Sequence, residues 1–276
     1  MKIAVIIPAA GSSRRFAKGL SAEGEPTDDL TMGRSKLDED LGGRPVLQRT
    51  VELFVKHPDV GFVVVAGPAD PGAMQHFRQR HADKLGLLGA VVCEGGKEHR
   101  YQTVQNALAL VPDTCTHVAV HDAARPCASP VLIERLFGAA ANHGAVIPAI
   151  DVPDTLKRVR ADTVVEEAPD PLAAILGAPP KGSGELRLVE QTLDRTRLVA
   201  VQTPQVFRLD LLRRAYAQKD LSSTDDSQLI ERLGEEVVVV PGEATNIKIT
   251  RPADVRLARA ILGFKGPDQR PTHMRF

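Results

Sequence analysis

The sequence predicts an α/β protein: a mostly parallel sheet with helices on both faces and an inserted β-arm. Three observations predict this fold class. Short, nearly continuous apolar runs alternate along the chain with helix-like stretches. The runs are rich in Val, Ile and Ala, which is typical of strands buried on both faces of a parallel sheet. The alternation breaks between residues 151 and 200 and then resumes.

The apolar runs define the expected strands. The first five cover residues 2–7, 62–66, 90–93, 116–121 and 145–150. Strands that alternate with helices imply βαβ units with right-handed crossovers, and so a Rossmann-like sheet. Two further strands are expected at residues 236–240 and 246–249.

The stretches between these runs have helical patterns. Helices are expected at residues 45–57, 101–111, 129–142, 209–218, 225–233 and 252–262. The third begins with Ser129 and Pro130, a capping residue followed by a proline in the first turn.

The break at residues 151–200 has a different composition. Two short β-like pieces, 155–158 and 186–190, flank APDPLAAILGAPPKGSG, which is dense in Pro, Gly and Ala. We interpret this segment as a β-arm with a flexible tip. The chain is then one domain, residues 1–264, that carries the arm as an insertion, and residues 265–276 form a polar, frayed tail.

The composition excludes several function classes. The 276 residues hold 35 Lys plus Arg and 35 Asp plus Glu, so no net charge attracts nucleic acid or an anionic membrane. Trp is absent and aromatic residues make up 4%, which argues against a base-stacking surface. No apolar stretch is long enough to span a bilayer. Three cysteines without a CxxC pair favour the reducing cytoplasm.

The first apolar run ends in PAAGSSRR, residues 8–15. Ligands bind beyond the carboxyl ends of parallel strands, small residues allow close approach to the backbone, and consecutive N–H groups can bind an anion. The stretch therefore predicts a phosphate cradle. It is neither a P-loop, GxxxxGK(S/T), nor a dinucleotide motif, GxGxxG. The alternative is a surface loop with two solvated arginines.

Four further stretches bear on this choice: EGGKEHRYQTVQNAL (94–108), VAVHDAARP (118–126), VQTPQVF (201–207) and NIKIT (246–250). Each stretch alone is weak evidence for a nucleotide site, because Asp122 could cap a turn and Lys248 could be an edge-strand lysine. We interpret Thr224 and Asp225, in STDDSQ, as a structural N-cap cluster. His121 is also read as structural.

Taken together, AAGxxxR, GGxxxRxxTV, HDAARP, DTLK, QTPQ and NIKIT resemble the 2-C-methyl-D-erythritol 4-phosphate cytidylyltransferases of the GT-A-like nucleotidyltransferase superfamily. The resemblance runs from about residue 2 to residue 262. It implies transfer of CMP from CTP to methylerythritol phosphate, with release of pyrophosphate, in non-mevalonate isoprenoid synthesis. Ribitol-5-phosphate cytidylyltransferases share much of the pattern, but DTLK is more similar to the erythritol enzyme.

The resemblance also implies roles for individual residues. The implied catalytic cations are Arg15, Lys36 and Lys248. The implied nucleotide-binding residues are Ala9, Ala10, Gly11, Gly95, Gly96, Arg100, Thr103 and Ala123. The implied binding residues for methylerythritol phosphate are Arg125, Thr155, Arg195 and Thr203. Asp122 resembles the Mg²⁺ ligand of the family. The arm of one subunit is implied to reach the other's site in a homodimer.

The chain departs from the family pattern in three places. Lys36 stands in SKL where PKQ is usual, after a long loop, so Lys18 competes with it. The arm is also long. Thr245 replaces an aspartate that usually precedes NIK, which bears on the metal site. The loop 17–34 is expected to act as a lid, with a solvated insertion as the alternative.

Two other functions stay open at this point. One is cytidylylation of another polyol phosphate, such as ribitol 5-phosphate. The other is a non-catalytic nucleotide-binding protein on the same scaffold, which the Thr245 substitution and the two insertions would favour. The presence of Arg15, Lys36, Asp122 and Lys248 together favours an enzyme.

Overall fold

The computed structural model describes residues 1–11, 13, 16–17, 19, 35–164 and 186–264. The chain divides into two compact units. One comprises Met1–Ile150 and Val201–Phe276, and the other is Asp151–Ala200. The proposed lid, the arm tip at 168–184 and the tail at 265–276 lie almost wholly outside the described residues.

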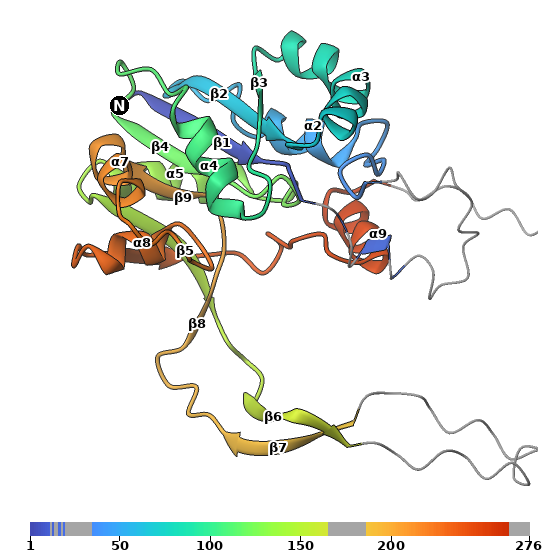
Figure 1. Ribbon diagram of the computed structural model, residues 1–276, viewed down its shortest axis with the longest axis vertical. Coiled ribbons are helices and arrows are strands. Elements are labelled where there is room, and N and C mark those ends of the chain that lie inside the picture. The colour runs from blue at the N-terminus through green and yellow to red at the C-terminus, as the bar shows by residue number, and fades with distance from the viewer. Residues whose placement is uncertain (12, 14–15, 18, 20–34, 165–185, 265–276) are drawn as a thin grey trace, which may run out of the picture. The chain divides into compact units, whose positions relative to one another are not determined.

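The first unit is built on one mixed, mostly parallel sheet (Figure 1). Its strand order is β10-β5-β9-β4-β1-β2-β3, and β8 pairs with β5. The strands are β1 (Ile3–Pro8), β2 (Val60–Gly67), β3 (Val91–Glu94), β4 (His117–Val120), β5 (Ala145–Asp151), β8 (Val199–Val201), β9 (Gln205–Arg208) and β10 (Val238–Pro241). The fold class predicted from the sequence is confirmed.

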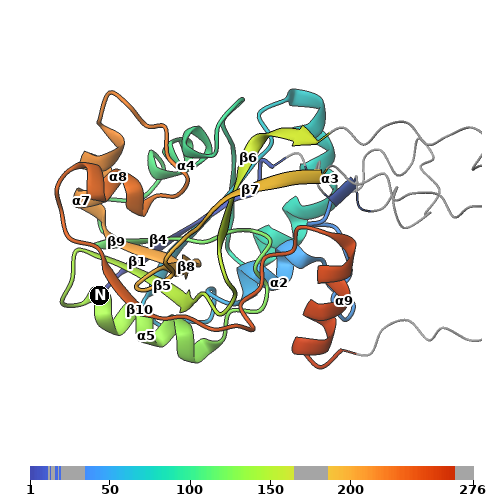
Figure 2. The same ribbon diagram turned by 90° about the horizontal axis from the view of Figure 1, so that it is seen from below.

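Helices cover both faces of this sheet (Figure 2). The helices are α2 (Val46–Glu52), α3 (Pro71–Leu87), α4 (Arg100–Leu108), α5 (Pro130–Ala140), α7 (Leu209–Tyr216), α8 (Ser227–Arg232) and α9 (Pro252–Ile261). Residues of α2, α3, α5 and α9 enter one buried cluster, and residues of α4, α7 and α8 enter the other.

Strand β1 shows why its sequence has no polar side. Ile3, Val5 and Ile7 belong to the first buried cluster, whereas Ala4 and Ile6 belong to the second. All five side chains are fully buried. Because successive side chains of a strand point to opposite faces, a strand covered on both sides must be apolar throughout.

Most expected elements of this unit are present, with small shifts at their ends. Ser129 caps α5 as expected, since its hydroxyl accepts the N–H of Leu132. The strand expected at residues 246–249 is wrong, because that segment is in no strand. Strand β9 runs antiparallel to β4 and β5 and was not expected.

Helix α3 was also missed, although its signals are in the sequence. Asp70 caps it, Pro71 is in its first turn, and Met74, Phe77 and Leu85 form its buried face. Polar residues separate these three, so the helical spacing is easily overlooked.

The second unit contains an antiparallel pair, β6 (Lys157–Val164) and β7 (Leu186–Thr192). All of β7 is exposed, including Leu186, Leu188 and Val189. The piece expected at residues 186–190 lies within β7, whereas the one expected at residues 155–158 overlaps β6 only at residues 157 and 158. Among the described residues of the whole chain, no helix is both long and apolar enough to cross a membrane.

Candidate active site

The loops after β1 and β3 meet at the carboxyl edge of the sheet. The Ala9 N–H donates to the Ala66 carbonyl at 2.7 Å, and the Gly95 N–H donates to the Gly67 carbonyl at 2.9 Å. Both amides therefore extend the sheet, and any cradle of free N–H groups begins after Ala9. Among the described residues, a Cβ at Gly11 would meet nothing within 4 Å, so this part of the edge is open to a ligand.

Gly95 is required where these two loops touch. A Cβ there would lie 2.5 Å from the Gly67 carbonyl oxygen and 2.9 Å from the Cβ of Ala10. The next residue, Gly96, donates its N–H to the Thr103 hydroxyl at 3.0 Å. Thr103 thus fixes the loop that leads into α4.

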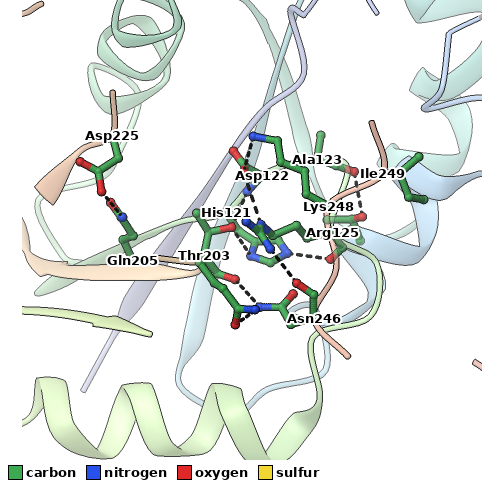
Figure 3. A network of polar contacts seen from close by, with 12 residues as sticks. His121, Asp122, Ala123, Arg125, Thr203, Gln205, Asp225, Asn246, Lys248 and Ile249 are labelled. Carbon is green, nitrogen blue, oxygen red and sulfur yellow. Dashed lines mark hydrogen bonds and ion pairs between the residues drawn. The ribbon is translucent and has the colours of Figure 1, made fainter. Parts of the chain in front are cut away.

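Asp122, two residues after the end of β4, is the centre of a cluster of cations (Figure 3). Lys248 Nζ lies 2.8 Å from Asp122 Oδ2, and Arg125 Nε lies 3.5 Å from the same oxygen. Arg100 Nε lies 3.7 Å from Oδ1. Burial alone would raise the pKa of Asp122, but Lys248, Arg100 and Arg125 hold it well below its usual range.

His121 and Thr203 fix the backbone that carries Asp122. The Asp122 N–H donates to the Thr203 hydroxyl at 3.0 Å, and His121 Nε2 lies 2.9 Å from the Arg125 carbonyl. Burial lowers the pKa of His121 to about 4, so the ring is neutral. Because a carbonyl only accepts, Nε2 carries the proton, and Thr203 donates to Nδ1 at 3.1 Å. The structural reading of His121 is confirmed.

The segment after Thr245 closes the cluster from the other side. Arg125 Nη1 donates to the Asn246 carbonyl at 2.6 Å, and the buried Asn246 amide donates to the Thr203 carbonyl at 2.9 Å. Ile249 donates its N–H to the Ala124 carbonyl at 2.8 Å. These bonds explain why residues 246–249 are not a strand: their polar groups bond to the loop after β4.

Lys36 is brought to this same segment. Its ammonium donates to the Ile249 carbonyl at 3.0 Å, one residue from Lys248. Asp38 anchors the chain around Lys36, since its carboxylate pairs with Arg80 at 2.6 Å and with His81 at 2.8 Å. The structure therefore brings Lys36 to the segment that carries Lys248. Arg15, and Lys18, which competes with Lys36 for its role, lie outside the described residues.

The remaining predicted residues fall in two groups. Ala123 contributes its carbonyl, which accepts the Thr50 hydroxyl at 2.9 Å. Thr155 and Arg195 belong to the second unit, where Thr155 is exposed and Arg195 donates to the carbonyls of Val152 and Pro153. Their relation to Asp122 stays a prediction.

Sequence reasoning missed the part played by Asp226. Asp225 has a structural role, as expected: it lies one residue before the N-cap position of α8 and accepts the Gln228 N–H at 3.1 Å. Its neighbour Asp226 is instead buried and pairs with Arg100 Nη1 at 2.8 Å. The two aspartates are adjacent in the sequence and alike in type, so nothing in STDDSQ distinguishes them.

A metal at this site would depend on Asp122. The described residues contain no cluster of three His, Cys, Asp or Glu side chains that could hold an ion. Thr245, where a second carboxylate was expected, is exposed and has none to offer. One carboxylate, completed by phosphate oxygens and water, is a ligand set that Mg²⁺ accepts. The residues present therefore fit Mg²⁺ bound together with a nucleotide.

The chain is similar to known proteins of one family. The family model of 2-C-methyl-D-erythritol 4-phosphate cytidylyltransferase matches residues 3–175 and 180–264. The cytidylyltransferase of that name from Solibacter usitatus is 37% identical over 265 residues, covering 95% of this chain and 96% of the relative. The one from Frankia casuarinae is 38% identical over 269 residues, covering 96% and 83%.

Solved structures carry the same name. The enzyme from Thermus thermophilus is 32% identical with a TM-score of 0.63, covering 95% of this chain and 98% of its own. The Francisella tularensis enzyme is 26% identical with a TM-score of 0.66, covering 95% and 100%.

Proposed function

The chain belongs to the 2-C-methyl-D-erythritol 4-phosphate cytidylyltransferase family, and we propose that it transfers CMP from CTP to 2-C-methyl-D-erythritol 4-phosphate. A phosphate oxygen of the acceptor forms a bond to the α-phosphorus of CTP, and the bond from that phosphorus to the β-phosphate oxygen breaks. Pyrophosphate leaves. The product is an intermediate of non-mevalonate isoprenoid synthesis.

The observation that carries this function is the cation cluster around Asp122. The reaction brings two anions together and stabilises charge on the transferring phosphorus and the leaving oxygen. Lys248, Arg125 and Arg100 lie around one carboxylate, and Lys36 bonds to the carbonyl of Ile249, the residue after Lys248. These residues supply the positive charge, and the open backbone edge at Gly11 lets the nucleotide approach.

The reaction requires no general base. A phosphate monoester has a second pKa of about 6, so the attacking group is already mostly a dianion at neutral pH. His121, the imidazole nearest to Asp122 in sequence, is fully buried, and both its nitrogens are bonded. It therefore orients the loop instead of moving a proton.

We propose Mg²⁺ as the cofactor, held by Asp122 together with the phosphates. When bound, it would reduce the negative charge of the triphosphate. Lys248 and Arg100 would then be freer to contact phosphate oxygens, because Asp122 would share its charge with the metal. Arg15, by resemblance, adds a further cation to the same group.

We also propose a homodimer through the arm. An isolated two-stranded antiparallel ribbon is marginally stable in water. In the second unit β7 leaves Leu186, Leu188 and Val189 exposed, and Leu198 and Val199 are exposed as well. A second copy would cover these side chains. Light scattering should give twice the chain mass of 29.7 kDa, and a monomer at micromolar concentration would contradict the proposal.

The three free thiols, Cys93, Cys115 and Cys127, are consistent with work in the reducing cytoplasm. The decisive test of function is incubation with CTP, Mg²⁺ and one acceptor at a time, followed by measurement of pyrophosphate. Methylerythritol phosphate should give stoichiometric pyrophosphate and a CDP-linked product. Release only with ribitol 5-phosphate would change the acceptor, and no release with either would leave a nucleotide-binding protein.

A further inference from the structure

Asp226 is a buried carboxylate with no role in capping its helix. It precedes α8, but its side chain makes no hydrogen bond to the first turn, and only 1% of the residue is exposed. Removing a carboxylate from water is costly unless it is paired, so its partners account for its presence. Asp225, its neighbour, already caps α8 through the Gln228 N–H.

The two carboxylate oxygens of Asp226 have different partners. Oδ1 accepts the Tyr216 hydroxyl of α7 at 2.6 Å, and Oδ2 lies 2.8 Å from Arg100 Nη1 at the start of α4. Burial and the nearby Asp226 raise the pKa of the Tyr216 phenol, so Tyr216 is a hydrogen donor at all working pH values. The tyrosine thus fixes the carboxylate, and the carboxylate holds one end of Arg100.

The other end of the Arg100 guanidinium faces the candidate active site. Its Nε lies 3.7 Å from Asp122 Oδ1, while Lys248 and Arg125 approach the other oxygen, Oδ2. Arg100 therefore spans two carboxylates, one from the loop after β4 and one from the start of α8. A planar guanidinium suits this geometry because its donors point in fixed directions, which a lysine ammonium lacks.

We propose that Asp226 is a positioning residue: with Tyr216 behind it, it holds the guanidinium of Arg100 so that Nε faces Asp122 and the arriving nucleotide. The inference rests on the proposed function, because it assigns Arg100 to the CTP side of the site. Without Asp226, Arg100 would turn toward Asp122 or toward solvent. The loss would fall on CTP binding, because Lys248 and Arg125 do not depend on this anchor.

The test is a double-mutant cycle of Asp226→Asn with Arg100→Ala. Alone, Asp226→Asn should raise the CTP KM about tenfold and leave the acceptor KM within twofold, since the change keeps the shape and removes the charge. In the Arg100→Ala background it should change the CTP KM less than twofold. Equal effects in both backgrounds would show that Asp226 acts independently of Arg100 and would overturn the proposal.

Asp225→Asn is the matched control, one residue away and without contact to Arg100. It should lower thermal stability, because the single amide oxygen of Asn cannot accept from both the Gln228 N–H and the Gln205 side chain, as the two oxygens of Asp225 do. It should leave the CTP KM unchanged. If Asp226→Asn does not fold, Tyr216→Phe replaces it in the cycle and should raise the CTP KM about threefold, only when Arg100 is present. An equal rise without Arg100 would overturn the proposal.

Calorimetric binding of CTP separates this inference from the proposed function. It measures the CTP affinity of the four proteins of the mutant cycle without any acceptor or turnover. A wild-type protein that binds CTP but releases no pyrophosphate would contradict the function alone. A wild-type enzyme that turns over, with additive losses in the cycle, would contradict only the role of Asp226.

Discussion

The ammonium of Lys248 lies 2.8 Å from the carboxylate of Asp122, across 126 residues of sequence. Lys248 is held there because the segment that carries it bonds to the loop after β4, through Asn246 and Ile249. The same carboxylate attracts Arg100 and Arg125, so removal of one cation leaves Asp122 paired.

Lys248→Ala should lower turnover about 100-fold while the fold is kept, because a transition-state charge partner is lost from a partly exposed side chain. The measurement is kcat with CTP and methylerythritol phosphate, beside a thermal melt. Lys2→Ala is the control, since it removes the same charge at the opposite end of β1, where Lys2 contacts Thr114. Turnover near the wild-type value would remove Lys248 from the catalytic set.

Gly95→Ala should destabilise the protein by about 1–3 kcal/mol, because its Cβ would overlap the Gly67 carbonyl oxygen and the Ala10 side chain. CTP binding should weaken as the two loops are forced apart. Gly86→Ala in α3 meets nothing within 4 Å and should leave CTP binding unchanged, with stability raised by at most about 1 kcal/mol. Denaturant melts and CTP titrations compare the two variants. Equal stability would show that the loops separate freely.

Acid should destabilise the fold through His121. Its pKa is about 4 in the folded protein and 6.5 ordinarily. Between these pH values His121 is protonated in the unfolded chain and neutral in the folded chain. The free energy of unfolding therefore falls as pH falls from about 6.5 to about 4. The full loss is about 3 kcal/mol. Denaturant melts across this range should show a shallower slope for His121→Asn.

His117→Asn provides the comparison for that experiment. Burial also lowers the pKa of His117, but this ring is only half-buried. Its replacement should therefore remove a smaller part of the slope. An unchanged slope in His121→Asn would mean that the ring accepts a proton while folded.

The parts of this site that follow a strand could be predicted from the sequence. An apolar run of residues predicts a strand, and the residues that follow it lie at the carboxyl edge of a parallel sheet. This argument places both Asp122 and Ala9 at that edge. Asp226 could not be found in this way. It reaches Arg100 only because α4, α7 and α8 pack on one face of the sheet, and a sequence spacing of 126 residues carries no sign of that.

The segment at 246–249 shows a second limit. Ile247 and Ile249 flank a lysine, an alternation that predicts a half-buried strand. The backbone instead bonds to Arg125 and Ala124, and the buried Asn246 side chain bonds to Thr203. Hydrogen bonds to distant loops have replaced a strand ladder, and the local sequence pattern would be the same in both cases.

Arg195→Ala should raise the KM for methylerythritol phosphate about tenfold and leave that for CTP within twofold. The resemblance implies that Arg195 binds the acceptor. Within the second unit, its guanidinium donates to the carbonyls of Val152 and Pro153. Arg187→Ala, an exposed arginine of β7, is the control and should change neither constant. An increase confined to CTP would place Arg195 on the wrong ligand.

Thr245→Asp should lower the Mg²⁺ concentration needed for half-maximal activity several-fold. Asp122 is the carboxylate that Lys248 and Arg125 both approach, and Thr245 is exposed next to Asn246, whose carbonyl holds Arg125. A carboxylate at 245 would give the metal a second protein ligand, as Mg²⁺ commonly has. Ala244→Asp adds the same charge one residue earlier, so a general electrostatic effect would appear in both variants. An equal Mg²⁺ requirement in wild type and Thr245→Asp would show that Asp122, the phosphates and water already satisfy the metal.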